Sequence, residues 1–252
     1  MRKGWIGFAA VCCAVMLNIS PSRAADENTK TGTDIGDIAP NFEVYDMNGN
    51  KVTLKDYKGK KLFVNFWGWW CPPCIREAEA LMHVAKKYEG KIEFLFVGVT
   101  TFYRDNKPLD PKEFADGFAP ELAEFKTGLL KAKLVRPDST TIKMHPELLP
   151  QFETRNKVVV DYYMTSKNSL FDFRGYWERQ FRAETNERYG IPVTYLIDGE
   201  GRIQLDVNPN DQYWDKNDDI LTDFIAGKDL SSYVARFPIP PHHQRKPETA
   251  QK

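Results

Sequence analysis

The sequence predicts an α/β domain, because two strand-like segments enclose a helix-like one. Residues 61–67 are almost continuously apolar, and so are residues 92–99, as expected of strands buried on both faces of a sheet. Between them, small and apolar residues recur at helical spacing over 78–85, and Gly90 provides a stop. Strand, helix and strand in this order form a βαβ unit with parallel strands and a right-handed crossover.

One hairpin is predicted before this unit and one after it. The first covers residues 40–54, where apolar and polar residues alternate around the turn Asn48-Gly49. The second covers residues 193–207, with a glycine-containing turn at 198–201. Together with the βαβ unit, these hairpins predict a central mixed sheet.

Four further elements are predicted outside the hairpins and the βαβ unit. Asp110-Pro111 is typical of a helix start, and apolar residues follow it at helical spacing up to Phe125. The run Val158-Val159-Val160 predicts a strand. Residues 176–189 and 215–225 have the patterns of amphipathic helices.

The first 24 residues predict a cleaved export signal. Arg2 and Lys3 supply a positive start, residues 5–17 an apolar stretch, and Ser22-Arg23-Ala24 a cleavage site with small residues. The alternative is a retained membrane anchor, although the apolar stretch is shorter than the ~20 residues of a spanning helix. We therefore expect a periplasmic or other extracytoplasmic protein, secreted by cleavage or, in the alternative, anchored to the membrane.

The remaining chain is expected to form one folded domain over 38–237, between a disordered linker at 25–37 and a disordered tail at 238–252. The whole chain has 35 basic and 35 acidic side chains, and loss of the first 24 residues, which hold three basic and no acidic ones, leaves a net charge of −3. No block of basic residues stands out, so we expect no nucleic-acid partner. We also expect a monomer.

The cysteines indicate chemistry rather than stability. Once the export signal is removed, only Cys71 and Cys74 remain. A stabilising disulfide usually joins distant segments, because the stabilisation grows with the closed loop, and a two-residue loop contributes little. We interpret the pair as a redox-active disulfide that needs no cofactor and no metal. Half a zinc site is the alternative, but no further cysteine and no histidine pair at finger spacing completes it.

The Cys-x-x-Cys motif lies where a strand leads into a helix, and a helix N-terminus favours a thiolate. We expect Cys71 to be exposed and to attack, and Cys74 to be buried and to resolve the mixed disulfide. Pro72 and Pro73 lack N–H groups, which is tolerated in the first helical turn, and they stiffen the loop. Glu77, one turn beyond Cys74, is a candidate proton carrier with a raised pKa, or else an ordinary exposed glutamate.

Other candidates lie beside the motif or in the second hairpin. Trp67 is expected in the core, whereas Trp69 and Trp70 could form an apolar landing surface for a polypeptide substrate, with packing alone as the alternative. Ile191-Pro192 begins a strand, and its proline is either a simple strand-start residue or part of a cis bond.

Residues 66–77, Phe-Trp-Gly-Trp-Trp-Cys-Pro-Pro-Cys-Ile-Arg-Glu, resemble the active-site segment of the TlpA/ResA-type thioredoxin-like proteins. Those proteins are extracytoplasmic thiol-disulfide oxidoreductases. Residues 39–49 resemble the family's N-terminal extension, and residues 189–198 resemble its cis-proline strand.

This resemblance implies a thioredoxin-like fold with a cis Pro192 that faces Cys71. It also implies that Ile191 offers its backbone to an extended substrate and that Glu77 carries a proton. We expect Pro72 and Pro73 to bind the substrate as well. Between the predicted strand that ends at Val99 and the predicted helix that begins at Tyr176, this chain has many more residues than a minimal member of the family.

We interpret residues 100–175, approximately, as an insertion that shapes partner choice, with decoration of no consequence as the alternative. The expected fold class is therefore α/β and thioredoxin-like, with a central mixed sheet, an N-terminal β-hairpin extension and this large insertion.

The expected function is that of an exported enzyme, a thiol-disulfide oxidoreductase that exchanges electrons with protein disulfides through Cys71 and Cys74. We expect it to act as a reductant, in cytochrome c maturation or in general disulfide reduction, with a membrane-bound thiol-disulfide electron donor to restore the dithiol. The reverse role, as a disulfide-forming oxidant or isomerase, depends on the reduction potential.

Two other functions are less compatible with the motif. A peroxiredoxin-type peroxidase has the pattern P-x-x-x-[ST]-x-x-C, and here Val64 and Gly68 stand at its first two defined positions. A Cu(I) delivery protein of the Sco type has a longer C-x₃-C spacing and a distant histidine, whereas this chain has C-x₂-C.

Overall fold

The computed structural model describes residues 30–100, 110–184, 190–207 and 214–237. The predicted export signal and the predicted C-terminal tail lie outside these residues, as do residues 25–29 of the predicted linker. Over the described ranges, no helix combines the length and the apolar character that crossing a membrane requires.

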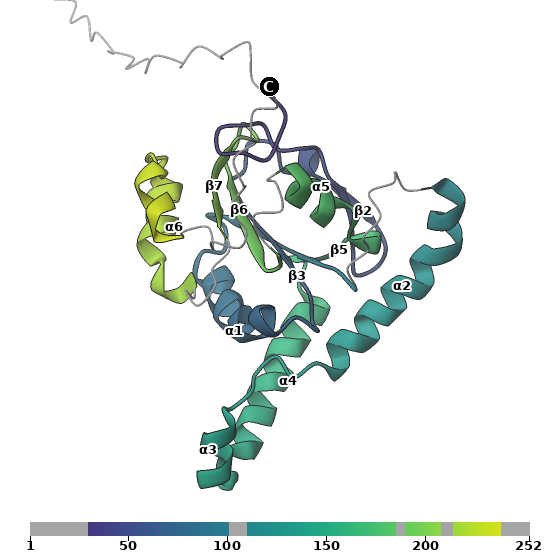
Figure 1. Cartoon of the computed structure of the whole chain (residues 1–252), viewed down its shortest axis with the longest axis vertical. Helices are drawn as coiled ribbons and strands as arrows, with labels where there is room; N and C mark the ends of the chain where they lie inside the picture. Colours follow the sequence, from purple (N-terminus) through teal and green to yellow (C-terminus); the bar gives the residue numbers. More distant parts are fainter. Residues whose placement is uncertain (1–29, 101–109, 185–189, 208–213, 238–252) are drawn as a thin grey trace, which may run out of the picture.

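A seven-stranded sheet lies at the centre of the domain, in the order β2-β1-β5-β4-β3-β6-β7 (Figure 1). Strand β3 runs parallel to β4 and antiparallel to β6, so the sheet is mixed, as predicted. The strands are β1 (Glu43–Asp46), β2 (Lys51–Thr53), β3 (Leu62–Trp67), β4 (Glu93–Gly98), β5 (Ser169–Phe171), β6 (Val193–Ile197) and β7 (Ile203–Val207).

Helices pack around this sheet and extend beyond it. They are α1 (Pro72–Lys87), α2 (Pro111–Lys131), α3 (Ser139–Met144), α4 (Leu149–Thr165), α5 (Tyr176–Glu184) and α6 (Asp218–Ala226). Helix α2 begins where the sequence predicts, because the Asp110 side chain accepts hydrogen bonds from the backbone N–H groups of Lys112 and Glu113. Figure 1 shows α3 and the adjoining half of α4 projecting away from the sheet.

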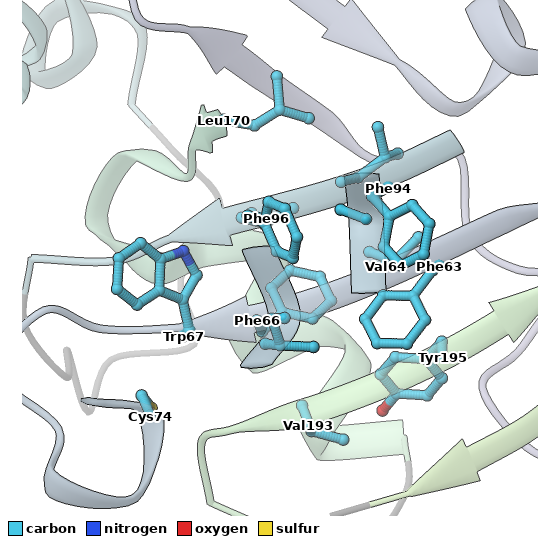
Figure 2. Close-up of a cluster of buried hydrophobic side chains, with 14 of the residues drawn as sticks. Phe63, Val64, Phe66, Trp67, Cys74, Phe94, Phe96, Leu170, Val193 and Tyr195 are labelled. Carbon is cyan, nitrogen blue, oxygen red and sulfur yellow. The ribbon is translucent and has the colours of Figure 1, made fainter. Parts of the chain in front are cut away.

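The two faces of β3 contact different helices, because successive side chains on a strand point to opposite sides. Trp67 packs against Tyr163 of α4, with ring centroids 4.6 Å apart. Phe66 packs against Phe181 of α5, at 5.2 Å. Figure 2 shows the aromatic residues buried around β3, with Trp67 among them as predicted.

Both predicted hairpins are present, as β1–β2 and β6–β7, and the βαβ unit is β3-α1-β4. The predicted helix at 215–225 is shorter, as α6, and the predicted helix at 176–189 is described only as far as Glu184.

The predicted strand at 158–160 is wrong, because these residues lie inside α4. Their β-branched side chains favour a strand locally, but tertiary packing overrides this preference. Val159, Val160 and Tyr163 are buried on one side of the helix, at helical spacing, while Val158 remains 50% exposed.

The predicted linker is also wrong where it can be examined, over residues 30–37. The backbone N–H of Gly32 donates to Ile38, that of Gly36 donates to Ile203, and the Thr33 side chain is buried. This segment therefore packs against the β6–β7 hairpin instead of forming a disordered connection.

The insertion contributes to the core of the domain. Its strand β5 lies between β1 and β4, antiparallel to the first and parallel to the second. Its helices α2 and α4 supply the buried side chains of Phe125 and Tyr163, both of which contact Trp67. A decorative surface loop would not provide such contacts.

Candidate active site

The two cysteines lie at the start of α1, just after β3 ends. Cys71 is the N-cap, Pro72 and Pro73 occupy the first two helical positions, and Cys74 the third. The backbone N–H of Cys71 donates to Gly68, and the two prolines have no N–H. Of the four donors that a helix N-terminus leaves unpaired, the Cys74 amide is therefore the one available to the Cys71 sulfur.

Both cysteines are free thiols, and their surroundings separate their acidities. The pKa of Cys71 is lowered, chiefly by a hydrogen bond from the Cys74 thiol and further by the Cys74 amide and the Arg76 charge, against the opposing effect of burial. The pKa of Cys74 is raised well above its ordinary value, mainly by burial and also by its neighbours Cys71 and Glu77. Cys71 is therefore the better nucleophile.

The expectation that Cys71 is exposed is wrong, since only 4% of its surface is accessible. The loop before β6 lies directly against it, and the Cys71 thiol donates to the carbonyl oxygen of Ile191 at 3.5 Å. The side chains of Trp70 and Ile191 also approach each other over Gly68, where a Cβ atom would lie 3.0–3.2 Å from both. A substrate must therefore displace or replace this contact with Ile191.

The peptide bond between Ile191 and Pro192 is cis, as the family resemblance implied. Both residues are buried, so the segment presents its backbone, rather than its side chains, to Cys71. A binding role for the Ile191 backbone stays a prediction.

Glu77 is buried, which distinguishes it from an ordinary surface glutamate. Burial raises its pKa to about 8, and a hydrogen bond from Asn65, whose Nδ2 lies 3.3 Å from Oε1, acts in the opposite direction. The same Asn65 Nδ2 donates to the Thr194 hydroxyl at 3.0 Å. This buried polar group connects α1, β3 and β6, and it holds a carboxyl group that can exchange a proton near neutral pH.

Sequence reasoning missed Asn65, Thr194 and Tyr163 as parts of this site. Asn65 and Thr194 are polar residues inside fully buried strands, and this is the signal that could have revealed them, because buried polar groups are almost always hydrogen-bonded. Tyr163 gave no such signal. Its hydroxyl donates to the Ala78 carbonyl of α1 at 3.0 Å, and Glu77 and Cys74 contribute to its raised pKa, after burial.

The tryptophans beside the motif are half-buried and tied to neighbouring segments. The Trp70 indole N–H donates to the Val99 carbonyl at 3.2 Å. The Trp69 indole lies on Gly128 of α2, where a Cβ atom would be 2.1 Å from its Cε2. Packing therefore accounts for much of both side chains, and their contribution to a landing surface stays a prediction.

Pro72 is exposed and Pro73 half-buried at the mouth of the helix. Within the described ranges, no group of three or more His, Cys, Asp or Glu side chains is placed to hold a metal ion.

Part of the chain is similar to known proteins. Residues 35–117 match the model of the AhpC/TSA family. The thiol-disulfide oxidoreductase ResA of Bacillus thuringiensis subsp. konkukian is 50% identical over 58 residues, which are 23% of this chain and 34% of that protein. ResA of Geobacillus kaustophilus is 34% identical over 116 residues, 44% of this chain and 64% of that protein.

Among solved structures, a putative thiol:disulfide interchange protein DsbE from Chlorobium tepidum aligns with a TM-score of 0.43 and 22% identity, covering 76% of this chain and 98% of that one. The chain spans between one third and two thirds of the length of the two ResA relatives.

The Cys-x-x-Cys motif at the start of α1 lies within the residues that match the AhpC/TSA family model. Residues 35–117 are thus similar to the AhpC/TSA family, and the segment that carries the redox motif is similar to that of the ResA thiol-disulfide oxidoreductases.

Proposed function

We propose that the protein is an exported thiol-disulfide oxidoreductase that reduces disulfides in protein substrates. The observation that carries this proposal is the pair of thiols with opposite pKa shifts at the start of α1, next to the Ile191 carbonyl. One sulfur is prepared to attack, and the other is kept protonated until it is needed.

In the first step, the Cys71 thiolate attacks one sulfur of the substrate disulfide. A Cys71–substrate bond forms, the substrate S–S bond breaks, and one substrate thiolate leaves. Loss of the Cys71 negative charge removes one of the causes that raise the pKa of Cys74.

In the second step, Cys74 gives its proton to the carboxylate form of Glu77 and attacks Cys71. The Cys71–Cys74 disulfide forms, and the second substrate thiolate leaves. The substrate gains two electrons, and the protein loses two. A pKa of about 8 allows Glu77 to accept and release a proton near neutral pH.

A membrane-bound thiol-disulfide donor would return the dithiol by the same exchange in reverse. Location outside the cytoplasm is supported by the export pattern at residues 1–24. A peroxidase function is less well supported, because the two thiols already form a complete exchange pair and Val64 and Gly68 depart from the peroxidase pattern.

The test is a trapping experiment with Cys74→Ser, which keeps the attacking thiol and lacks the resolving one. Incubation of the reduced variant with a disulfide-containing protein should accumulate a mixed disulfide on Cys71, which mass spectrometry identifies. Cys71→Ser should form none. The proposal fails if the Cys74→Ser variant accumulates no adduct and if both variants retain the activity of the unmodified protein.

The direction of electron flow is tested by equilibration with glutathione and dithiothreitol buffers. A reductant should have a potential more negative than about −200 mV, the range of glutaredoxins and thioredoxin. A value near about −120 mV, as in strong periplasmic oxidants, would assign the opposite direction.

A further inference from the structure

We propose that the groove between α1 and the insertion binds the polypeptide that flanks the cysteine of a substrate disulfide, and that it favours flanks with both acidic and apolar side chains. This inference rests on the proposed thiol-disulfide exchange and names the class of partner. The α1–insertion groove is bounded by residues 72–79 of α1, residues 134–136 between α2 and α3, and residues 152–155 of α4, and its volume is about 410 Å³.

The groove is lined by the residue that directly follows the reactive cysteine. This residue, Pro72, is exposed. An extended polypeptide advances about 3.3 Å per residue. A segment whose cysteine is bonded to Cys71 can therefore enter the groove with the residues that immediately follow or precede that cysteine.

The floor of the groove is apolar. Ile75, Leu134 and Val135 line it with their surfaces mostly buried, and Phe152 lines it with a half-buried ring. Three of these four side chains come from the insertion or its connecting segments. The floor can accommodate apolar side chains of a partner, and it is a feature of this chain's insertion rather than of the Cys-x-x-Cys motif.

The rim of the groove is positively charged. Arg76, Arg136 and Arg155 line it together with a single acid, Glu79. Arg155 is already paired with Glu79, its Nε donating to Oε1 at 2.9 Å. The lining residues therefore carry a net charge of +2, on a chain whose formal net charge is zero. Such a local field favours acidic partners.

Arg136 is the rim residue best placed to recognise a partner without serving the thiol chemistry. Its Nε donates to the Lys133 carbonyl at 2.8 Å, which orients an exposed guanidinium group. Arg76 is less suitable as a probe, because its charge also lowers the pKa of Cys71.

One wall of the groove continues into the projecting part of the insertion (Figure 1). Met144 at the end of α3 is 67% exposed, and Leu149 at the start of α4 is 43% exposed. A polypeptide fits these features better than an oligonucleotide, because the floor is apolar and Pro72, which lines the groove, directly follows the reactive cysteine.

The experiment compares three peptides that each carry one cysteine in a mixed disulfide with mercaptoethanol. In the first peptide the residues that flank the cysteine are aspartate and leucine. In the second they are lysine and leucine, and in the third aspartate and serine. The rate at which the reduced protein releases mercaptoethanol from each peptide is measured at low ionic strength. Binding of the same peptides with serine in place of cysteine is measured by fluorescence anisotropy.

The aspartate–leucine peptide should react and bind best, by about fivefold over the lysine–leucine peptide, the size expected of one or two exposed ion pairs. Arg136→Glu should abolish or invert this preference when each peptide rate is divided by the rate of the same variant with the neutral reagent hydroxyethyl disulfide. Lys112→Glu, an equal charge change at an exposed position outside the groove, should keep the preference. Added salt should reduce it.

Equal rates and affinities for all three peptides would overturn the proposal, and so would a preference that survives Arg136→Glu. Binding of a single-stranded oligonucleotide as tight as that of the aspartate–leucine peptide would also overturn it, since the groove would then bind polyanions in general. If no disulfide is reduced but the peptides bind with the stated dependence on Arg136, the proposed function fails while the docking site stands.

Discussion

Replacement of Glu77 by glutamine should make the free energy of unfolding less dependent on pH. Glu77 is buried, and its pKa rises from an ordinary value of 4.5 to about 8 in the fold. Between these two pH values the folded state keeps a proton that the unfolded chain releases. The contribution of Glu77 to the free energy of unfolding is therefore highest below pH 4.5, falls as the pH rises, and levels off above pH 8.

The size of this effect follows from linkage, at about 1.36 kcal/mol for each pH unit over which the two states differ by one proton. From pH 5 to pH 8, the unmodified protein should lose roughly 3 to 4 kcal/mol through Glu77. Glutamine keeps a carbonyl oxygen for the hydrogen bond from Asn65 and does not titrate. The stability of Glu77→Gln relative to the unmodified protein should rise by this amount over the same range.

The assay is urea unfolding of both proteins at several pH values, with the cysteines kept reduced. Asp172 is also buried, and its pKa is raised to about 7, so it contributes to the slope of each protein. Taking the difference between two proteins that both contain Asp172 removes that contribution. A difference that stays constant within about 1 kcal/mol from pH 5 to pH 8 would refute the assignment of a raised pKa to Glu77.

Two further predictions concern the motif and its support. The pKa of Cys71, followed by thiolate absorbance, should be higher in Cys74→Ala than in Cys74→Ser, because only the serine hydroxyl can replace the hydrogen bond that favours the thiolate; equal values would contradict this cause. Gly128→Ala should lower stability in thermal unfolding by about 1–3 kcal/mol through collision with Trp69. Gly117→Ala, in the same helix with its nearest contact at 3.3 Å, should be nearly neutral; equal losses would count against the collision.

The local signals in the sequence were sufficient for the elements around the motif. The apolar run before Cys71, the prolines at the helix start and the glycine-containing turns each act through neighbours in the chain, and β3, α1 and both hairpins formed as predicted. The cis bond at Pro192 required the family resemblance, because the residue types alone do not distinguish it from an ordinary strand start.

Two predictions from the sequence were wrong because contacts between distant parts of the chain override local preferences. Val158-Val159-Val160 has local strand preference, but its surroundings in the fold make it helical. Cys71 occupies an exposed position on a helix considered by itself, and the loop at Ile191, distant in sequence, buries it.

By itself, the sequence determined the reactive pair and its place at a helix start, since both depend on residues a few positions apart. Only the tertiary structure decided which groups surround that pair. Asn65 and Thr194 meet because β3 and β6 are neighbours in the sheet, and the insertion meets α1 because α4 packs against it. Contacts of this kind depend on the order of strands and helices in space, which no short stretch of sequence encodes.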